Sequence, residues 1–109
     1  MSAKKALLKP RKKKLAPEEV LIQVLEGLGS SSEEIFTFMI ARGIKGRREY
    51  STDCPVARFL KEDGYASSTV SVKKWVTKAD ALTVGTPPAV REFICDFDHN
   101  RYPSLVEKP

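Results

Sequence analysis

Cys54, Cys95 and His99 are the cysteine and histidine side chains of this sequence, and side chains of these types can perform covalent or metal chemistry. Cys54 precedes Pro55 at the expected start of a helix, where the dipole lowers a thiol pKa and could activate a nucleophile. Cys95 and His99 share a helix face at a spacing that can hold a metal, but two ligands are not four. No glycine-rich or oxyanion pattern stands beside Cys54, and free cysteines are usually small buried apolar residues. We therefore expect a non-catalytic protein with no metal or other cofactor.

A dense run of cations opens the chain. Residues 1–16, here called the basic arm, hold seven basic side chains and no acidic one, so the arm has a formal charge of +7. The seven are Lys4, Lys5, Lys9, Arg11, Lys12, Lys13 and Lys14. The remainder, here called the body, holds the other 12 of the 19 basic residues and all 14 acidic ones, so its formal net charge is −2. The positive net charge therefore belongs entirely to the arm.

The arm has three interpretations. Seven cations on a flexible segment would release counterions from phosphates and bind nucleic acid without sequence preference. The letters KPRKKK also match a nuclear-localisation run, a pattern of low specificity. A solvated tail that aids solubility or contacts an acidic protein would carry the same charges. We favour the first interpretation.

A second basic group follows the expected second helix. It comprises Arg42, Lys45, Arg47 and Arg48. Cations there complement the negative end of a helix dipole, which explains them without any ligand. In a functional interpretation they would contact phosphates, and Tyr50 beside them could stack on a base. Glu49 and Asp53 dilute the group.

Two helices are expected at the start of the body. The first begins at Pro17 and can end at Gly29, and its apolar residues fall on one broad face, which comprises Val20, Leu21, Val24, Leu25 and Leu28. The second takes Ser31 or Ser32 as its N-cap and ends at Gly43. Its apolar residues cannot read base edges, which argues against a DNA-reading helix-turn-helix. We predict a core hairpin of two helices instead.

The remaining elements mix helix and strand. A third helix is expected over residues 55–63, a strand over 69–76, and a weaker strand over 81–84 that returns as a hairpin. If the strand face that Trp75 shares with Ser71 and Lys73 is open, Trp75 and Lys73 could form a stacking platform or a hot spot for a protein partner. If a helix covers that face, Trp75 belongs to the core. Thr86 is a candidate cap for a last helix. Its buried stripe is Val90, Phe93, Ile94 and Phe97, and Tyr102 and Leu105 then pack against the body.

These elements predict one small α+β domain over residues 17–109. It has about four helices and one β-hairpin, and a disordered basic arm precedes it. No apolar stretch approaches the ~18 residues of a membrane span, so we expect no membrane partner. Two distant cysteines favour a reduced, cytoplasmic protein over a disulfide framework.

The stretches CPVARFL and FDHNRYPSL resemble a group of small proteins of actinobacteria and their phages. The matching positions are Cys54, Pro55, Ala57, Phe59 and Leu60, then Phe97, Asp98, Arg101, Tyr102, Pro103 and Leu105. The similarity spans roughly residues 33–105 and leaves out the basic arm. Asn100 stands where these proteins often have glycine, and asparagine also tolerates the left-handed conformation. The resemblance implies a prokaryotic or viral cytoplasmic setting and no particular activity.

Two functional hypotheses follow. The first is a non-catalytic accessory protein whose arm contacts nucleic-acid phosphates non-specifically while the body binds a protein partner or a second copy of itself. The second is a phage or bacterial protein-interaction module, an inhibitor or a structural component, in which the arm has no nucleic-acid role. An exposed apolar patch around Trp75 would favour the second hypothesis.

Overall fold

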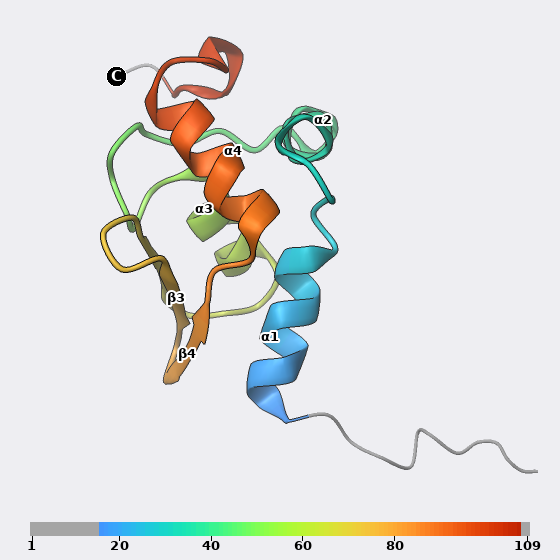
Figure 1. Ribbon diagram of the computed structural model, residues 1–109, viewed down its shortest axis with the longest axis vertical. Helices are drawn as coiled ribbons and strands as arrows, with labels where there is room; N and C mark the ends of the chain where they lie inside the picture. Colours follow the sequence, from blue (N-terminus) through green and yellow to red (C-terminus); the bar gives the residue numbers. More distant parts are fainter. Residues whose placement is uncertain (1–15, 108–109) are drawn as a thin grey trace, which may run out of the picture.

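The computed structural model describes residues 16–107, which form four α-helices and a three-stranded antiparallel sheet (Figure 1). The α+β class predicted from the sequence is confirmed. In chain order the elements are α1 (Pro17–Glu26), α2 (Ser32–Arg42), α3 (Pro55–Glu62), β2 (Ser68–Ser71), β3 (Val76–Ala79), β4 (Leu82–Gly85), α4 (Pro88–Asp98) and a short 3-10 turn at Pro103–Leu105.

The first two helices begin at the predicted residues. Pro17 occupies the first turn of α1, and the Glu19 side chain accepts a hydrogen bond from the Ala16 amide at 2.9 Å. Ser31 caps α2 by accepting from the Glu34 amide at 3.2 Å. Gly43, with φ +68°, ends α2 in the left-handed conformation. Local capping chemistry therefore sets these boundaries.

Gly29 does not end α1, which is a correction to the sequence-based boundary. The helix already ends at Glu26, and Gly27 is its C-cap. A Cβ atom on Gly29 would lie 2.8 Å from the Glu34 Cβ, and its φ of +153° is one that side-chain-bearing residues avoid. Gly29 thus permits the close approach of the chain to the start of α2.

The predicted hairpin is a three-stranded meander in the order β2-β3-β4. The strand expected over residues 69–76 is broken by a turn at residues 72–75, where Trp75 takes φ +50° and the Ser71 hydroxyl accepts from the Lys74 amide. Because β-branched residues continue through the break, the alternation alone does not show it. Asp80, with φ +54°, starts the tight link from β3 to β4.

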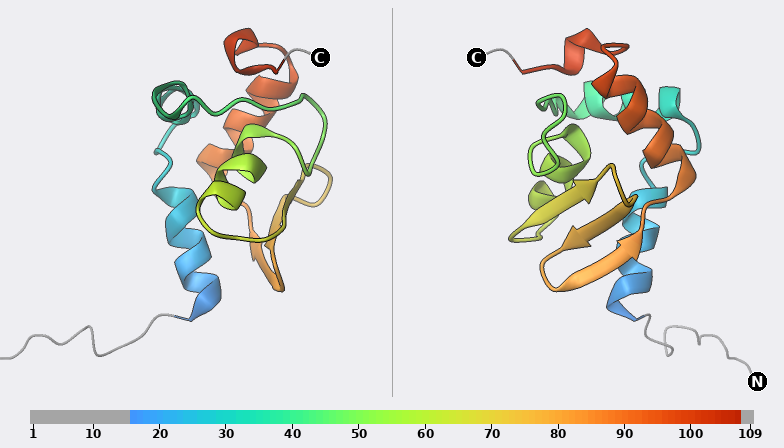
Figure 2. Two further views of the ribbon diagram at one scale, coloured as in Figure 1. Left: turned by 180° about the vertical axis from the view of Figure 1, so that it is seen from behind. Right: turned by 60° about the vertical axis from the view of Figure 1, so that its left-hand side comes forward.

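The helices gather on one side of the sheet (Figure 2). The α3 helix packs on β2, α1 packs on β4, and α4 contacts both α1 and α2. The stripe predicted for α4 is buried as expected, as are Tyr102 and Leu105. The predicted hairpin of α1 and α2 is wrong, because each helix packs chiefly against other elements. The two helices share α4 as a support. Val20, which was expected on the apolar face of α1, is 41% exposed, and Ile40 on α2 is 48% exposed.

The segment after α4 is tied down by polar contacts. The buried Ser32 hydroxyl donates to Asp96 Oδ2 at 2.7 Å, which leaves the Tyr102 hydroxyl to donate to Ser32 at 2.6 Å. Gly46 forms a parallel bridge with Val106, and its amide donates to the Leu105 carbonyl at 2.9 Å. The loop between α2 and α3 is thereby fastened to the end of the chain.

Thr86 does not cap α4, contrary to the sequence-based prediction. Pro87 takes the N-cap position, and no side chain caps that end. The buried Thr86 hydroxyl instead shares a 2.9 Å hydrogen bond with Thr77 of β3. The contact satisfies two buried hydroxyls at once, which outweighs a solvent-exposed cap.

Candidate functional site

The seven predicted phosphate-binding residues of the basic arm, Lys4 to Lys14, lie outside the described residues. What the structure describes is the point of attachment, because α1 begins at Pro17, directly after the predicted boundary. The start of α1 lies at the opposite end of the body from the loop that follows α2 (Figure 1). The two cationic groups predicted from the sequence therefore join the body at opposite ends.

The second basic group is only partly available to a ligand. The Arg42 guanidinium lies over the rings of Phe38 and Phe59, 5.3 and 5.7 Å from their centroids. Arg47 pairs with Asp53 at 3.4 Å and lies 5.1 Å from the centroid of Tyr50. These contacts hold two of the four cations on the surface of the body.

Lys45 and Arg48 complete the second basic group. Both are exposed, and neither forms an ion pair within residues 16–107. The loop thus retains two cations that are free to contact phosphates, while one face of Tyr50 is covered by Arg47.

An ion cluster that the sequence did not indicate is centred on Arg58 of α3. Its Nε and Nη2 atoms donate to the two carboxylate oxygens of Asp53 at 2.8 and 3.1 Å, and Nη2 also donates to Glu107. The hydrogen bonds from Arg58 lower the pKa of Asp53 and the pKa of Glu107. One guanidinium therefore joins the loop, α3 and the end of the described chain, which are distant in sequence.

The Arg58→Gln variant is expected to unfold more readily at neutral pH, with the difference from the wild type fading in acid. Because folding lowers the pKa of Asp53 and Glu107, their stabilisation is complete above the unfolded carboxyl pKa of about 4. It is lost as the pH falls through the lowered folded values. Denaturant midpoints of both proteins across an acid titration measure this. A difference that is constant with pH, or equal to that of the exposed control Arg91→Gln, would contradict the assignment.

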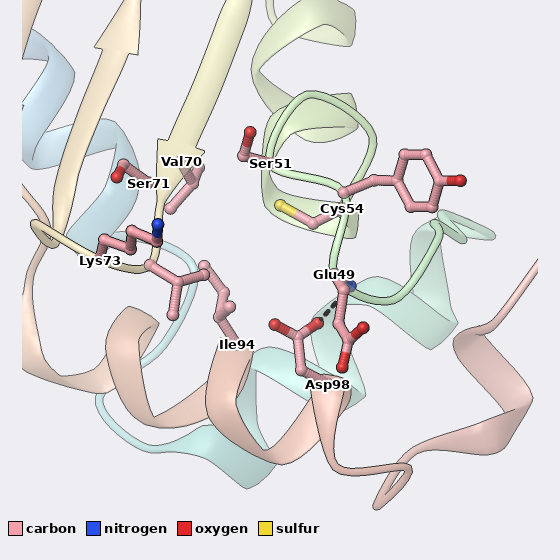
Figure 3. A pocket seen from close by; sticks show the side chains of 10 residues that line it. Glu49, Ser51, Cys54, Val70, Ser71, Lys73, Ile94 and Asp98 are labelled. Carbon is pink, nitrogen blue, oxygen red and sulfur yellow. Dashed lines mark hydrogen bonds between the residues drawn. The ribbon is translucent and has the colours of Figure 1, made fainter.

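A groove of about 280 Å³ lies between the loop before α3, the end of β2 and the end of α4 (Figure 3). Val70, Ile94 and Cys54 supply its apolar wall, and the Cys54 sulfur points toward the space between the other two. Glu49 and Asp98 lie on one side, and Lys73 lies on the sheet side. The groove brings together residues of three elements that are far apart in the sequence.

The Cys54 thiol is not activated, contrary to what its place at a helix start suggested. Burial raises the pKa of Cys54 to about 11, and hydrogen bonds from the backbone amides of Ala57 and Val56 oppose this only in part. The sulfur caps α3 by accepting from the Ala57 amide at 3.4 Å. Removal from water outweighs the helix dipole here, so Cys54 has a capping and packing role.

In the folded protein, Cys95 is expected to react with a disulfide reagent at about pH 8 at least 100-fold faster than Cys54. Cys95 is exposed, whereas Cys54 is buried and holds its proton. Stopped-flow thiol titration of the Cys95→Ser and Cys54→Ala variants separates the two rates. Equal rates in folded protein would show that the Cys54 thiol is accessible, and unfolding in denaturant should make the rates converge.

Asp98 has a structural role in the groove. Its Oδ1 accepts the Glu49 amide at 2.9 Å, which holds the loop where Glu49 takes φ +64° (Figure 3). Burial raises the pKa of Asp98, and the negative charge of Glu49 adds to the effect. The carboxylate thus fixes one wall of the groove at a strained loop residue.

Cys95 and His99 do not form a metal site with other residues of the described chain. Residues 16–107 contain no group of three or more histidine, cysteine, aspartate or glutamate side chains placed to hold a metal. His99 Nδ1 instead lies 2.7 Å from the Cys95 carbonyl oxygen, to which it can donate. The His99 ring at the end of α4 therefore has a hydrogen-bond partner within its own helix.

Trp75 does not belong to a continuous strand face. It occupies the turn between β2 and β3, is half-buried, and packs against the hydrophobic core. Of the two alternatives, the structure favours the core position over an open stacking platform. The exposed apolar residues near the groove are Tyr50 and Val72, at 54% and 40% exposure.

No family model matches the chain, and neither does any curated protein or solved structure. The resemblance to small actinobacterial and phage proteins therefore stays a prediction. Within the described residues, no helix is long and apolar enough to cross a membrane. The function must be argued from charge and geometry.

Proposed function

We propose that this protein is a non-catalytic accessory protein that contacts nucleic-acid phosphates through its basic arm. One observation carries the proposal: seven cationic residues and no acidic one precede a body whose own formal net charge is −2. Phosphate neutralisation supplies most of the affinity of sequence-independent binding, and it requires this kind of local cation density. The contact would position the protein without selecting a sequence.

The neighbouring helix supports a separate role for the arm. The α1 helix carries Glu18, Glu19 and Glu26 and no basic residue. Charge density therefore falls abruptly at Pro17, and no basic helix continues the arm. A surface of this sign repels phosphates, so the arm, and not α1, would make the phosphate contact.

The body would supply a second contact, with a protein partner or with another copy of the chain. The groove lined by Val70 and Ile94 supports this part of the proposal, because Tyr50 and Val72 are exposed at its rim. Exposed aromatic and aliphatic residues beside a concave apolar surface are typical of protein contacts. The setting implied by the resemblance, a prokaryotic or viral cytoplasm, agrees with such a role.

The test compares full-length protein with a variant in which the seven arm cations are glutamines. Binding of each to single-stranded and duplex oligonucleotides is measured across a salt series, and sedimentation of the same samples reports self-association. A steep salt dependence that disappears in the variant supports the proposal. Equal binding by both proteins excludes the arm as the phosphate contact.

A further inference from the structure

One face of the sheet is covered by helices, and the other is open (Figure 2). The inward side chains of the strands include Val70, Thr77, Ala79 and Val84, all of which are buried. The alternate positions are more exposed and point outward, because successive side chains of a strand lie on opposite faces. The outward set is Thr69 and Ser71 on β2, Val76 and Lys78 on β3, and Thr83 and Gly85 on β4.

The strand register places these residues in two rows. Thr69, Lys78 and Thr83 form one row, because Lys78 is paired with Thr69 on β2 and with Thr83 on β4. Ser71, Val76 and Gly85 form the other. Lys74, in the turn between β2 and β3, borders the second row. The open face therefore combines three hydroxyl groups and Val76 with a lysine in its central strand and another at its edge.

This face is a shallow depression of about 400 Å³ and carries no negative charge. Its lining consists of Thr69, Ser71, Lys74, Val76, Lys78 and Thr83. Neither lysine forms an ion pair with any residue of 16–107. The hydroxyl groups can donate to an anion, and both ammonium groups are available to do so.

The sheet is one of two positively charged parts of an acidic body, and the other is the loop that holds Lys45, Arg47 and Arg48. Residues 67–87 contain three lysines and a single acid, Asp80, whose Oδ1 accepts the Ser67 amide at 2.9 Å. The rest of the body is left with nine basic and thirteen acidic residues. An approaching polyanion would be drawn to the sheet and repelled by α1, because clustered charges steer association.

We propose that the open face of the sheet, through Lys74 and Lys78, is a second phosphate-binding surface that takes the backbone of the nucleic acid held by the arm. The inference rests on the proposed function for the identity of the ligand. The arm supplies most of the affinity, and the sheet fixes where the strand lies on the body. Hydroxyl groups beside the two lysines suit phosphate and sugar oxygens and carry no sequence preference.

The test is made in the full-length chain with Lys74 and Lys78 both changed to glutamine. Loss of two phosphate contacts is expected to lower the salt slope of duplex binding by about 2. The affinity ratio of wild type to variant should shrink roughly tenfold between about 50 and about 200 mM salt. The control removes the same charge from α4 and the segment after it, as Arg91→Gln with Arg101→Gln, and should leave the slope nearly unchanged.

Gly85 gives a paired test on the same face. A Cβ atom there would meet no other atom within 4 Å, so longer side chains can be added without a clash. Gly85→Lys is expected to raise the salt slope by about 1, and Gly85→Glu to weaken binding at low salt. Circular dichroism confirms that each variant is folded.

The outcomes separate this inference from the proposed function. If the double lysine variant behaves like its control, the sheet is not a contact, whatever the arm does. If neutralising the arm changes nothing but the lysine variant binds weakly, the sheet binds phosphates without the arm, and the arm proposal fails. If full-length protein binds anionic vesicles through these lysines but binds no oligonucleotide, both proposals are overturned.

Discussion

Replacing the seven arm cations by glutamine is expected to weaken duplex binding about 1000-fold at about 50 mM salt. Each lysine or arginine that neutralises a phosphate releases a counterion, and seven such contacts correspond to a slope of about 6 on duplex and about 5 on a single strand. The body cannot replace the lost phosphate contacts of the arm, because its formal net charge is −2. Fluorescence anisotropy across a salt series measures both the affinity and the slope.

The matched control keeps the charge and changes the side chain. With the six arm lysines replaced by arginine, all seven cations remain, and affinity should stay within a few-fold of the wild type at every salt concentration. A probe of scrambled sequence should bind equally well, since phosphate contacts carry no sequence information. The proposal is wrong if the glutamine variant binds as tightly as the arginine variant.

The Phe93→Ala variant is expected to lower the free energy of unfolding by about 3 to 5 kcal/mol. Phe93 is fully buried on α4, and its ring stacks on Phe97 and Tyr102 with centroid distances of 6.3 and 5.6 Å. Truncation removes these contacts and leaves a cavity where α4 meets its neighbours. The whole free energy of unfolding of a small domain is about 5 to 15 kcal/mol, so chemical denaturation should show a large shift of the denaturant midpoint.

Phe38→Ala serves as the comparison for Phe93. Phe38 is half-buried on α2 and meets Phe59 edge-on at 5.3 Å, with Arg42 over its ring. Its neighbours can relax toward solvent, so its loss should cost about 1 to 2 kcal/mol. Equal losses at the two positions would show that α4 is not the centre of the core.

The starts of the first three helices and the end of the second were predictable because capping is a local effect. Pro17, Ser31, Gly43 and Pro55 each act through groups within four residues along the chain, so their residue types and positions suffice. The buried stripe of α4 was equally visible as a periodic pattern. The break in the strand at residues 72–75 was not visible in the sequence. The valines on either side favour a strand whether or not the chain turns between them.

The candidate site was less predictable than the fold. The place of Cys54 at a helix start was predicted, but its raised pKa depends on burial that several distant elements create. The ion cluster centred on Arg58 joins three segments, and no residue close to Arg58 in the sequence indicates that Glu107 is its partner. Lys74 and Lys78 were assigned no role, since the register that places them on one open face exists only in the folded sheet.

The amino-acid sequence alone establishes the division between a cationic arm and a faintly acidic body, the α+β class, and the main helix starts. These depend on composition and on interactions along a few neighbouring residues. Tertiary structure decided which helices pack together, where the chain turns between β2 and β3, and which polar groups lose contact with water. Long-range packing creates these features, because the partners of each side chain are set by burial of the whole core rather than by local preference.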